Sequence, residues 1–266
     1  MDFLSKIIET KRDRLQLLRE QTAISDLRVR ALDSRLHTKL HRLLEALAND
    51  TGINIIAEIK RASPSRGLIR TDVDPAALGA AYERGGAVAI SVLTEEDHFQ
   101  GSLDDLRVVR QAVSLPLLRK DFIVDEFQIY EAAVAGADAI LLIVAAMDDS
   151  LLRHLRSVAE DEMGMDALIE VHTEEELRRA ADCGATLIGV NNRDLRTFEV
   201  SLGTSARLIQ YAPRDAICIS ESGLDSADDL RRLGDLGYSG FLIGEMLMRA
   251  EQPEAMLRTL LEEAEK

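Results

Sequence analysis

Short apolar runs recur along the chain, and longer segments with a mixed apolar and polar pattern separate them. The runs are nearly continuous, which is typical of strands buried on both faces. They predict eight strands, at residues 55–60, 87–94, 115–123, 139–145, 167–172, 187–192, 216–222 and 240–245.

The segments between the predicted strands have the apolar spacing of amphipathic helices. The clearest lie at 103–112, 125–135, 174–182, 226–236 and 254–265. Asp74 before Pro75 predicts another helix start, and Ser102 with Asp105 resembles a capping box. Helical runs end at Gly136, Gly184 and Gly237, where a left-handed residue is expected.

Strands that alternate with helices predict a parallel sheet with right-handed crossovers. Eight such units can close into a ring, and 266 residues suit one α/β domain of the (β/α)8 TIM barrel type. An open doubly wound sheet is the alternative, but no GxGxxG motif follows the first strand. We therefore expect a barrel in residues 51–266. Residues 1–50 would form a helical extension that plugs or covers one barrel end.

Composition and charge narrow the possible partners. The formal net charge of −15 opposes binding to the phosphate backbone of nucleic acids. No apolar run reaches the roughly 20 residues of a membrane span, and the first residues lack the apolar core of a secretory signal. Cys183 and Cys218 lie far apart and predict reduced, structural thiols. These features predict a cytoplasmic protein that binds neither membranes nor nucleic acid.

The first predicted strand carries two ionisable residues, Glu58 and Lys60. Side chains alternate along a strand, so both point to the same face, roughly 6 to 7 Å apart. A carboxylate and an ammonium on an apolar strand are costly to bury without compensation. The pair therefore indicates a reactive site.

Other polar residues stand at or just after the ends of later strands, where TIM barrels place their active sites. They are Lys120, Glu170, Asn191, Arg193, Glu221 and Ser222. For each residue alone, a solvated or salt-bridged strand end is an equal alternative. Convergence of lysines and glutamates on one barrel mouth would push their pKa values apart and create acid and base roles.

Two loop features suggest how a substrate is held. The loop at 61–67 contains Ser63 and is longer than a simple βα connection, so it is a candidate lid. Ser222-Gly223 and Gly244-Glu245 close the seventh and eighth strands, where barrels often bind phosphate on main-chain amides.

Aromatic and histidine residues leave alternatives open. Phe99 and Phe122 could pack in the core or stack on an aromatic substrate. His37 and His41 are expected on a solvated face of a helix rather than at a metal. His172, close to Glu170, is a minor site candidate.

With these residues in view, the chain resembles indole-3-glycerol phosphate synthase. The matching strings run in order from the first strand to the eighth: AEIKRASPSRG, SVLTE, FQGS, LRKDFI, GADAILLI, LIEVH, GVNNRDL, SESG and FLIGEMLM. The N-terminal fifty residues match only in having a helical extension. The resemblance implies a single-activity enzyme of tryptophan biosynthesis, a carboxy-lyase that needs no cofactor and no metal.

The family's reaction converts 1-(2-carboxyphenylamino)-1-deoxyribulose 5-phosphate to indole-3-glycerol phosphate, carbon dioxide and water. By resemblance, Lys120 is the general acid, Lys60 contacts the substrate carboxylate, and Glu170 assists as acid or base. Glu58 orients the lysines, Glu221 completes the catalytic group, and Asn191 binds substrate hydroxyls. The resemblance further assigns substrate contacts to Ser63, Phe99, Phe122, Arg193, Ser222, Gly223, Gly244 and Glu245.

Two other functions remain possible at this point. A barrel of the class I aldolase type would use Lys120 or Lys60 to form a Schiff base. A noncatalytic sensor of a sugar phosphate would bind without turnover. In each case the partner is a small anion, and the protein is expected to be a monomer or a weak homo-oligomer.

Overall fold

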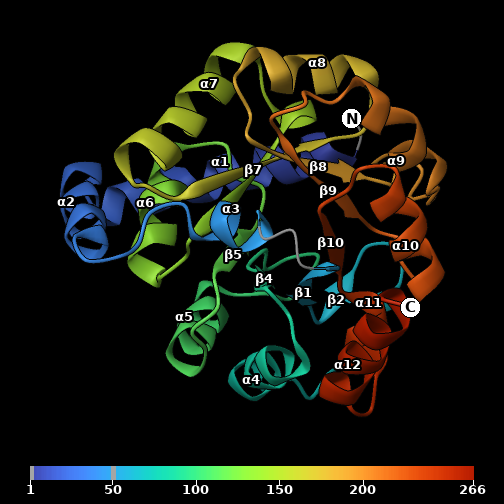
Figure 1. Cartoon of the computed structure of the whole chain (residues 1–266). Coiled ribbons are helices and arrows are strands. Elements are labelled where there is room, and N and C mark those ends of the chain that lie inside the picture. Colours follow the sequence, from blue (N-terminus) through green and yellow to red (C-terminus); the bar gives the residue numbers. More distant parts are fainter. Residues whose placement is uncertain (1–2, 49–51) are drawn as a thin grey trace.

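A closed barrel of eight parallel strands forms the centre of the computed structural model, which describes residues 3–48 and 52–266 (Figure 1). The strands are β1 (Asn54–Ile59), β4 (Ala89–Leu93), β5 (Leu117–Lys120), β6 (Ala139–Ile143), β7 (Asp166–Val171), β8 (Leu187–Asn191), β9 (Ile217–Glu221) and β10 (Gly240–Ile243). β1 closes the ring by pairing with β4 on one side and β10 on the other. The predicted single TIM barrel is confirmed, and the open sheet is excluded.

Helices cover the outside of the barrel, as Figure 1 shows. They are α4 (Pro75–Gly85), α5 (Leu103–Ala112), α6 (Glu126–Ala135), α7 (Asp149–Ser157), α8 (Glu174–Asp182), α9 (Gly203–Leu208), α10 (Ala227–Asp235) and α12 (Pro253–Ala264), with the short α11 (Glu245–Arg249) after β10. The predicted caps are confirmed, since Asp74 accepts a hydrogen bond from the Ala77 amide and Ser102 from the Asp105 amide.

The burial of the strands explains their continuous apolar sequences. Every residue of β1, β4, β6, β7, β8 and β10 is buried, because side chains face either the barrel interior or the helical layer. Burial on both faces removes the alternation that a half-exposed strand would show. The charged residues inside these strands are therefore exceptions that need partners.

Some details differ from the sequence predictions. The strand predicted at 115–123 is only β5, because the proline at 116 has no amide hydrogen to donate and the residues after Lys120 turn away as a loop. Helix α7 was not among the predicted helices, although its apolar residues Leu152 and Leu155 are buried at helical spacing.

The N-terminal extension consists of three helices, α1 (Phe3–Gln21), α2 (Ile24–Arg35) and α3 (Arg42–Leu47). α1 covers the carboxyl ends of the strands, where the Lys11 Nζ lies 2.8 Å from an oxygen of Asp121, just after β5. α3 covers the amino ends, where the Leu43 amide donates to the Asp166 carboxylate at the start of β7. Figure 1 shows α3 in front of the barrel and α1 behind it. The predicted extension thus contacts both barrel ends, and its predicted boundary at residue 50 lies outside the described residues.

The expectation that His37 and His41 share a helix is wrong. α2 ends at Arg35, and His41 has a left-handed φ of 50° at the start of α3. The His41 Nδ1 lies 3.1 Å from the buried Asp166 carboxylate, so a tertiary contact determines the local backbone. The His41 side chain remains 42% exposed, which agrees with the expected solvation.

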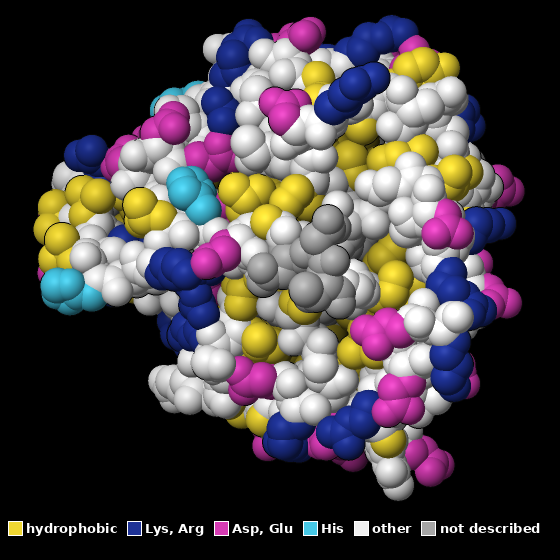
Figure 2. Space-filling model, in the orientation of Figure 1, with side chains coloured by type: hydrophobic (Ala, Val, Ile, Leu, Met, Phe, Trp, Pro, Cys, Tyr) yellow, Lys and Arg dark blue, Asp and Glu magenta, His cyan; other side chains and the backbone are white. Residues whose placement is uncertain are grey.

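The surface has a mixed charge pattern on the face that Figure 2 shows. Acidic and basic side chains alternate there, and a hydrophobic patch lies over α2, where Val29 and Leu36 are exposed. Within the described residues, no helix is long and apolar enough to cross a membrane. Cys183 and Cys218 are free and buried, as predicted.

Candidate active site

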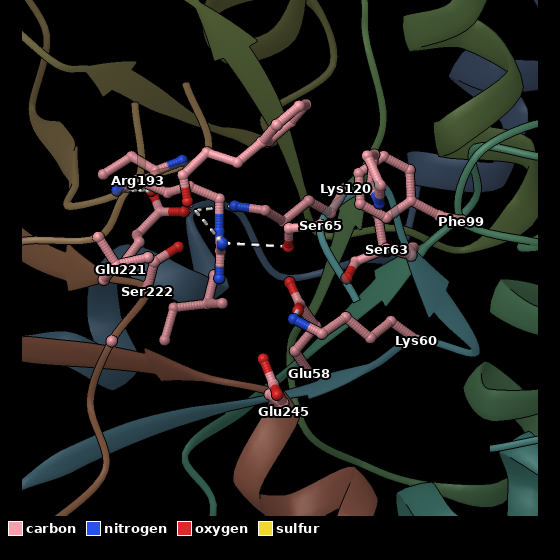
Figure 3. Close-up of a pocket in the computed structure, with 18 of the residues that line it drawn as sticks. Glu58, Lys60, Ser63, Ser65, Phe99, Lys120, Arg193, Glu221, Ser222 and Glu245 are labelled. Atoms are coloured by element: carbon pink, nitrogen blue, oxygen red, sulfur yellow. Dashed lines mark hydrogen bonds and ion pairs between the residues drawn. The ribbon is translucent and has the colours of Figure 1, made fainter. Parts of the chain in front are cut away.

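A cavity of about 480 Å³ opens at the carboxyl ends of the barrel strands. Except for the minor candidate His172, the site residues predicted from the sequence all line it: Glu58, Lys60, Ser63, Phe99, Lys120, Phe122, Glu170, Asn191, Arg193, Glu221, Ser222, Gly223, Gly244 and Glu245. Figure 3 shows the labelled members of this group arranged around one hollow. The structure therefore gathers side chains from β1, β5, β7, β8, β9 and β10 at a single site.

Glu58 and Lys60 form an ion pair at one side of the cavity. The Lys60 Nζ lies 2.7 Å from the Glu58 Oε1, and the Glu58 side chain is 4% exposed. Gly244, directly after β10, leaves space for this ion pair. A Cβ at position 244 would clash with the Glu58 Oε1. The strand alternation that placed both residues on one face is thus confirmed.

Lys120 lies between two other carboxylates. Its ammonium forms a hydrogen bond with Glu221 and lies 3.4 Å from the Glu170 Oε2. Both glutamates are nearly inaccessible to solvent, and Lys120 is 14% exposed. The charges of three buried groups therefore depend on each other.

The electrostatic environment separates the pKa values of these groups. Burial lowers the pKa of Lys120, but Glu221 and Glu170 outweigh that effect and raise it above its usual value. Burial raises the pKa of Glu221 to about 7, although Lys120 opposes the shift. For Glu170, burial is outweighed by Lys120 and His172, so its pKa is lowered. Near neutral pH this cluster thus combines the charged ammonium of Lys120, the ionised carboxylate of Glu170 and the carboxyl group of Glu221, which can carry a proton.

An apolar region lines another part of the cavity. The rings of Phe99 and Phe122 lie 6.3 Å apart between centroids, at an interplanar angle of 40°. Phe122 is 8% exposed, and both rings face the cavity as well as the core. The two readings that the sequence left open are compatible, because a ring can pack on the core and present one face to a ligand.

A cationic region lies near the ends of β8 and β9. The Arg193 Nη1 donates hydrogen bonds to the Ser65 Oγ at 3.1 Å and to the Phe198 carbonyl at 3.2 Å. The contact with Ser65 is drawn in Figure 3. Ser222 and Gly223 have φ values of 68° and 74°, and a positive φ is uncommon for serine. Backbone in this sparsely populated region is typical of functional sites.

The Glu245 carboxylate forms ion pairs with two arginines. Its Oε1 lies 3.3 Å from the Arg66 Nε and 3.1 Å from the Arg249 Nη2. Arg66 and Arg249 also line the cavity, so the Glu245 carboxylate is paired with two arginines at the cavity wall.

The loop after β1 contains a short antiparallel pair, β2 (Ala62–Ser63) and β3 (Gly67–Leu68). Arg61, just before β2, forms a bidentate ion pair with Asp105. The loop lies over the cavity, where Ser63, Ser65 and Arg66 line it.

Several lining residues were missed by the sequence analysis. Phe3 and Leu4 reach the cavity from α1, and Phe198 reaches it from the loop after β8. The Phe3 ring packs edge-on against Phe198, with centroids 5.2 Å apart. Apolar residues at the start of a helix gave no signal for this role, because only the docking of α1 brings them to the barrel mouth.

His172 lies next to this site but contributes no surface to the cavity as the structure describes it. Its ring lies between Glu170 and Glu176. Among the described residues, no group of three histidine, cysteine or acidic side chains is arranged to hold a metal ion.

Comparisons with known proteins agree with this geometry. The sequence model of the family described as indole-3-glycerol phosphate synthase matches residues 4–260. The enzyme of that name from Desulfosudis oleivorans is 44% identical over 260 residues, which cover 98% of each chain. The one from Koribacter versatilis is 54% identical over 210 residues, or 79% of this chain and 80% of that protein.

Solved structures share the fold at much lower identity. A thiamine phosphate pyrophosphorylase from Pyrococcus furiosus is 16% identical, with a TM-score of 0.61 over 84% of this chain and 98% of that chain. This likeness shows the barrel alone. The family match over nearly the whole chain is more specific, and on that basis this chain belongs to the indole-3-glycerol phosphate synthase family.

Proposed function

We propose that this chain converts 1-(2-carboxyphenylamino)-1-deoxyribulose 5-phosphate to indole-3-glycerol phosphate, with release of carbon dioxide and water. The observation that carries the proposal is the position of Lys120. Its ammonium lies between Glu170 and Glu221, in a cavity that also has aromatic rings and an arginine. These three kinds of group match the substrate: the ammonium suits its ketone, the aromatic rings suit its aromatic ring, and the arginine suits its phosphate.

Ring closure begins when the aromatic carbon that bears the carboxylate attacks the ketone carbon. Lys120 donates a proton to the ketone oxygen and stabilises the negative charge that develops there. The two carboxylates keep Lys120 protonated before the reaction, because they raise its pKa. Its hydrogen bond with Glu221 is replaced by one with the substrate oxygen as the new carbon–carbon bond forms.

Decarboxylation follows because loss of carbon dioxide restores the aromatic ring. Lys60 holds the substrate carboxylate until that step, and its ion pair with Glu58 orients the ammonium. The carboxylate leaves as neutral carbon dioxide, so the attraction to Lys60 is lost and the step is hard to reverse.

Water loss makes the closed five-membered ring aromatic. The hydroxyl formed from the ketone takes a proton and leaves, and the adjacent carbon loses a proton to form the ring double bond. Glu170 and Glu221 serve these transfers, since their pKa values are shifted in opposite directions by the same buried environment.

The ends of the substrate are held by different groups. Arg193 and the main chain at Ser222-Gly223 and Gly244-Glu245 bind the phosphate, and Asn191 binds the sugar hydroxyls. Ser63 closes over the substrate from the loop after β1, and Phe99 and Phe122 hold the aromatic ring. Holding both ends of a flexible substrate converts binding energy into orientation of the reacting carbons.

We propose that the protein acts as a monomer or as a weak homo-oligomer. The substrate is a small anion that carries a carboxylate and a phosphate. Free, buried cysteines are consistent with a reducing compartment such as the cytoplasm.

Indole fluorescence tests the proposal directly, because the chain contains no tryptophan. The protein is incubated with the carboxyphenylamino substrate, and growth of indole emission is expected. Absence of product at any enzyme concentration would overturn the proposal. Borohydride is added to a parallel sample, and covalent trapping of the substrate would indicate the Schiff-base chemistry of an aldolase instead.

A further inference from the structure

His172 lies between two carboxylates at the end of β7. Its Nδ1 is 3.2 Å from the Glu176 Oε2, and its Nε2 is 3.4 Å from the Glu170 Oε1. The imidazole is only 12% exposed, so it is largely shielded from solvent. The Nε2 is buried and has no hydrogen-bond partner of good geometry among the described residues.

Glu176 fixes the position of the ring. Its Oε2 accepts a hydrogen bond of 2.7 Å from the His172 amide as well as the contact with the Nδ1. Its own amide is capped by the Thr173 hydroxyl at the first turn of α8. Glu176 therefore fixes the imidazole through its Nδ1, and the Nε2 lies at an ion-pair distance of 3.4 Å from the Glu170 Oε1.

The contact between His172 and Glu170 can hold one proton in two ways. An imidazolium can donate its Nε2 hydrogen to the Glu170 carboxylate. Alternatively, a protonated Glu170 can donate to a neutral Nε2. The same two heavy atoms serve both arrangements. At 3.4 Å they form an ion pair outside hydrogen-bond geometry, so the two side chains must approach slightly before the proton moves between them.

We propose that His172, held by Glu176, is a positioning residue that orients the Glu170 carboxylate and shares one proton with it. This inference rests on the proposed function, in which Glu170 transfers a proton during the reaction. The other oxygen of Glu170 faces Lys120, so His172 also determines which oxygen the ammonium contacts.

The surrounding charges keep a proton on this pair. Burial lowers the pKa of His172, but Glu176, Glu170 and Glu221 outweigh it, and the net pKa is raised. Lys120 and Asn191 face Glu170 from β5 and β8 and favour its ionised form. Loss of His172 would leave Glu170 with Lys120 and Asn191, which both favour its ionised form, and the shared proton would be lost at a lower pH.

Steady-state kinetics of His172→Gln test this role. We expect kcat to fall about 10- to 100-fold, with KM changed less than about twofold. The alkaline limb of the kcat profile between about pH 6 and about pH 9 is expected to move to lower pH. Glu176→Gln should move the limb in the same direction with a smaller loss of kcat.

His154→Gln is the matched control. His154 also contacts a glutamate, with 3.1 Å between its Nε2 and the Glu126 Oε2, but it is 55% exposed and outside the site. Its substitution should leave kcat and the pH profile unchanged. A purely structural role of His172 would lower kcat without moving the alkaline limb, and that result would overturn the proposal.

Nitrogen NMR of the imidazoles gives a test that needs no turnover. The chain has five histidines, so the His172 signals can be assigned by its substitution. Glu170→Gln should lower the pKa of His172, and an unchanged titration would contradict the shared proton. If the wild-type protein makes no indole product, the proposed function fails, while this titration still decides the coupling. If His172→Gln does not fold, substitution of the other four histidines assigns the His172 signals by elimination, and the titration with Glu170→Gln and Glu176→Gln still decides the coupling.

Discussion

The Glu221 carboxylate occupies the space in which a side chain at Gly189 would begin. A Cβ at position 189 would lie 2.1 Å from the Glu221 Oε1, well inside contact distance. The two residues are on neighbouring strands, β8 and β9, and both are buried. Glu221 is 1% exposed and lines the cavity, so a displaced carboxylate would have to move toward the cavity. A side chain at position 189 would therefore shift the Glu221 carboxylate from its place beside Lys120.

Gly189→Ala should displace the Glu221 carboxylate from Lys120. We expect kcat to fall about 10- to 100-fold, because displacement by about 1 Å is costly at a reacting centre. The free energy of unfolding should fall by about 1–3 kcal/mol from overpacking. Gly234→Ala in α10 is the control, since a Cβ there would meet only atoms at 3.8 Å or more. Equal activity of the two variants would contradict the packing argument.

Asp121 should make the stability of the protein depend on pH. Burial raises its pKa, but Arg119 and Lys11 outweigh that effect and lower the pKa from 3.8 to about 2. A lowered folded-state pKa stabilises the protein above pH 3.8, and the contribution is lost as the pH falls through about 2. The shift corresponds to about 2 kcal/mol at neutral pH.

Asp121→Asn should therefore destabilise the protein most at neutral pH, with a smaller difference from wild type as the pH falls. Urea unfolding at neutral and acid pH measures this difference. The loss at neutral pH should be about 3 kcal/mol or more, since Lys11 and Arg119 would be left buried without their partner. Asp13→Asn on the exposed side of α1 is the control. A difference that does not change with pH would show that the charge of Asp121 is not the cause.

Arg193→Ala should weaken phosphate binding. We expect KM to rise about 10- to 100-fold, the cost of one charge-assisted contact, and inhibition by inorganic phosphate to weaken by a similar factor. Arg193→Lys should have a KM between those of the wild-type protein and Arg193→Ala. Arg196 has a side chain that is 78% exposed, and its substitution by alanine should change neither constant. Unchanged substrate affinity in Arg193→Ala would exclude a phosphate contact there.

Local sequence patterns were sufficient to predict the barrel because parallel strands buried on both faces have an uninterrupted apolar sequence. Positive φ values at Gly136, Gly184 and Gly237 confirm the helix ends. The break after α2 could not be predicted, because His41 adopts its left-handed conformation beside Asp166, which is 125 positions away in the chain. A contact between residues so far apart in the chain does not affect the local pattern of apolar and polar residues, so that pattern cannot predict it.

The strand-end rule predicted the members of the site, since parallel strands in a closed barrel end at the same mouth. It could not predict the contribution of Phe3, which depends on how α1 docks. The rule also could not predict which of Glu170 and Glu221 has the higher pKa. Their opposite pKa shifts come from the arrangement of Lys120, His172 and burial, which only the folded chain determines.

Lys120→Met tests the role of the ammonium most directly. The thioether keeps the length of the side chain but has no proton to donate and no charge. Lys39→Met is the control, because Lys39 is 65% exposed and pairs with Glu45 away from the site. Circular dichroism should show that both variants are folded.

The measurement is the rate of indole fluorescence growth at saturating substrate, with substrate binding measured separately by calorimetry. Lys120→Met should lose about 100- to 10,000-fold in kcat while it still binds the substrate, as expected for removal of a general acid. Near-normal turnover in this variant would contradict the assignment of proton donation to Lys120.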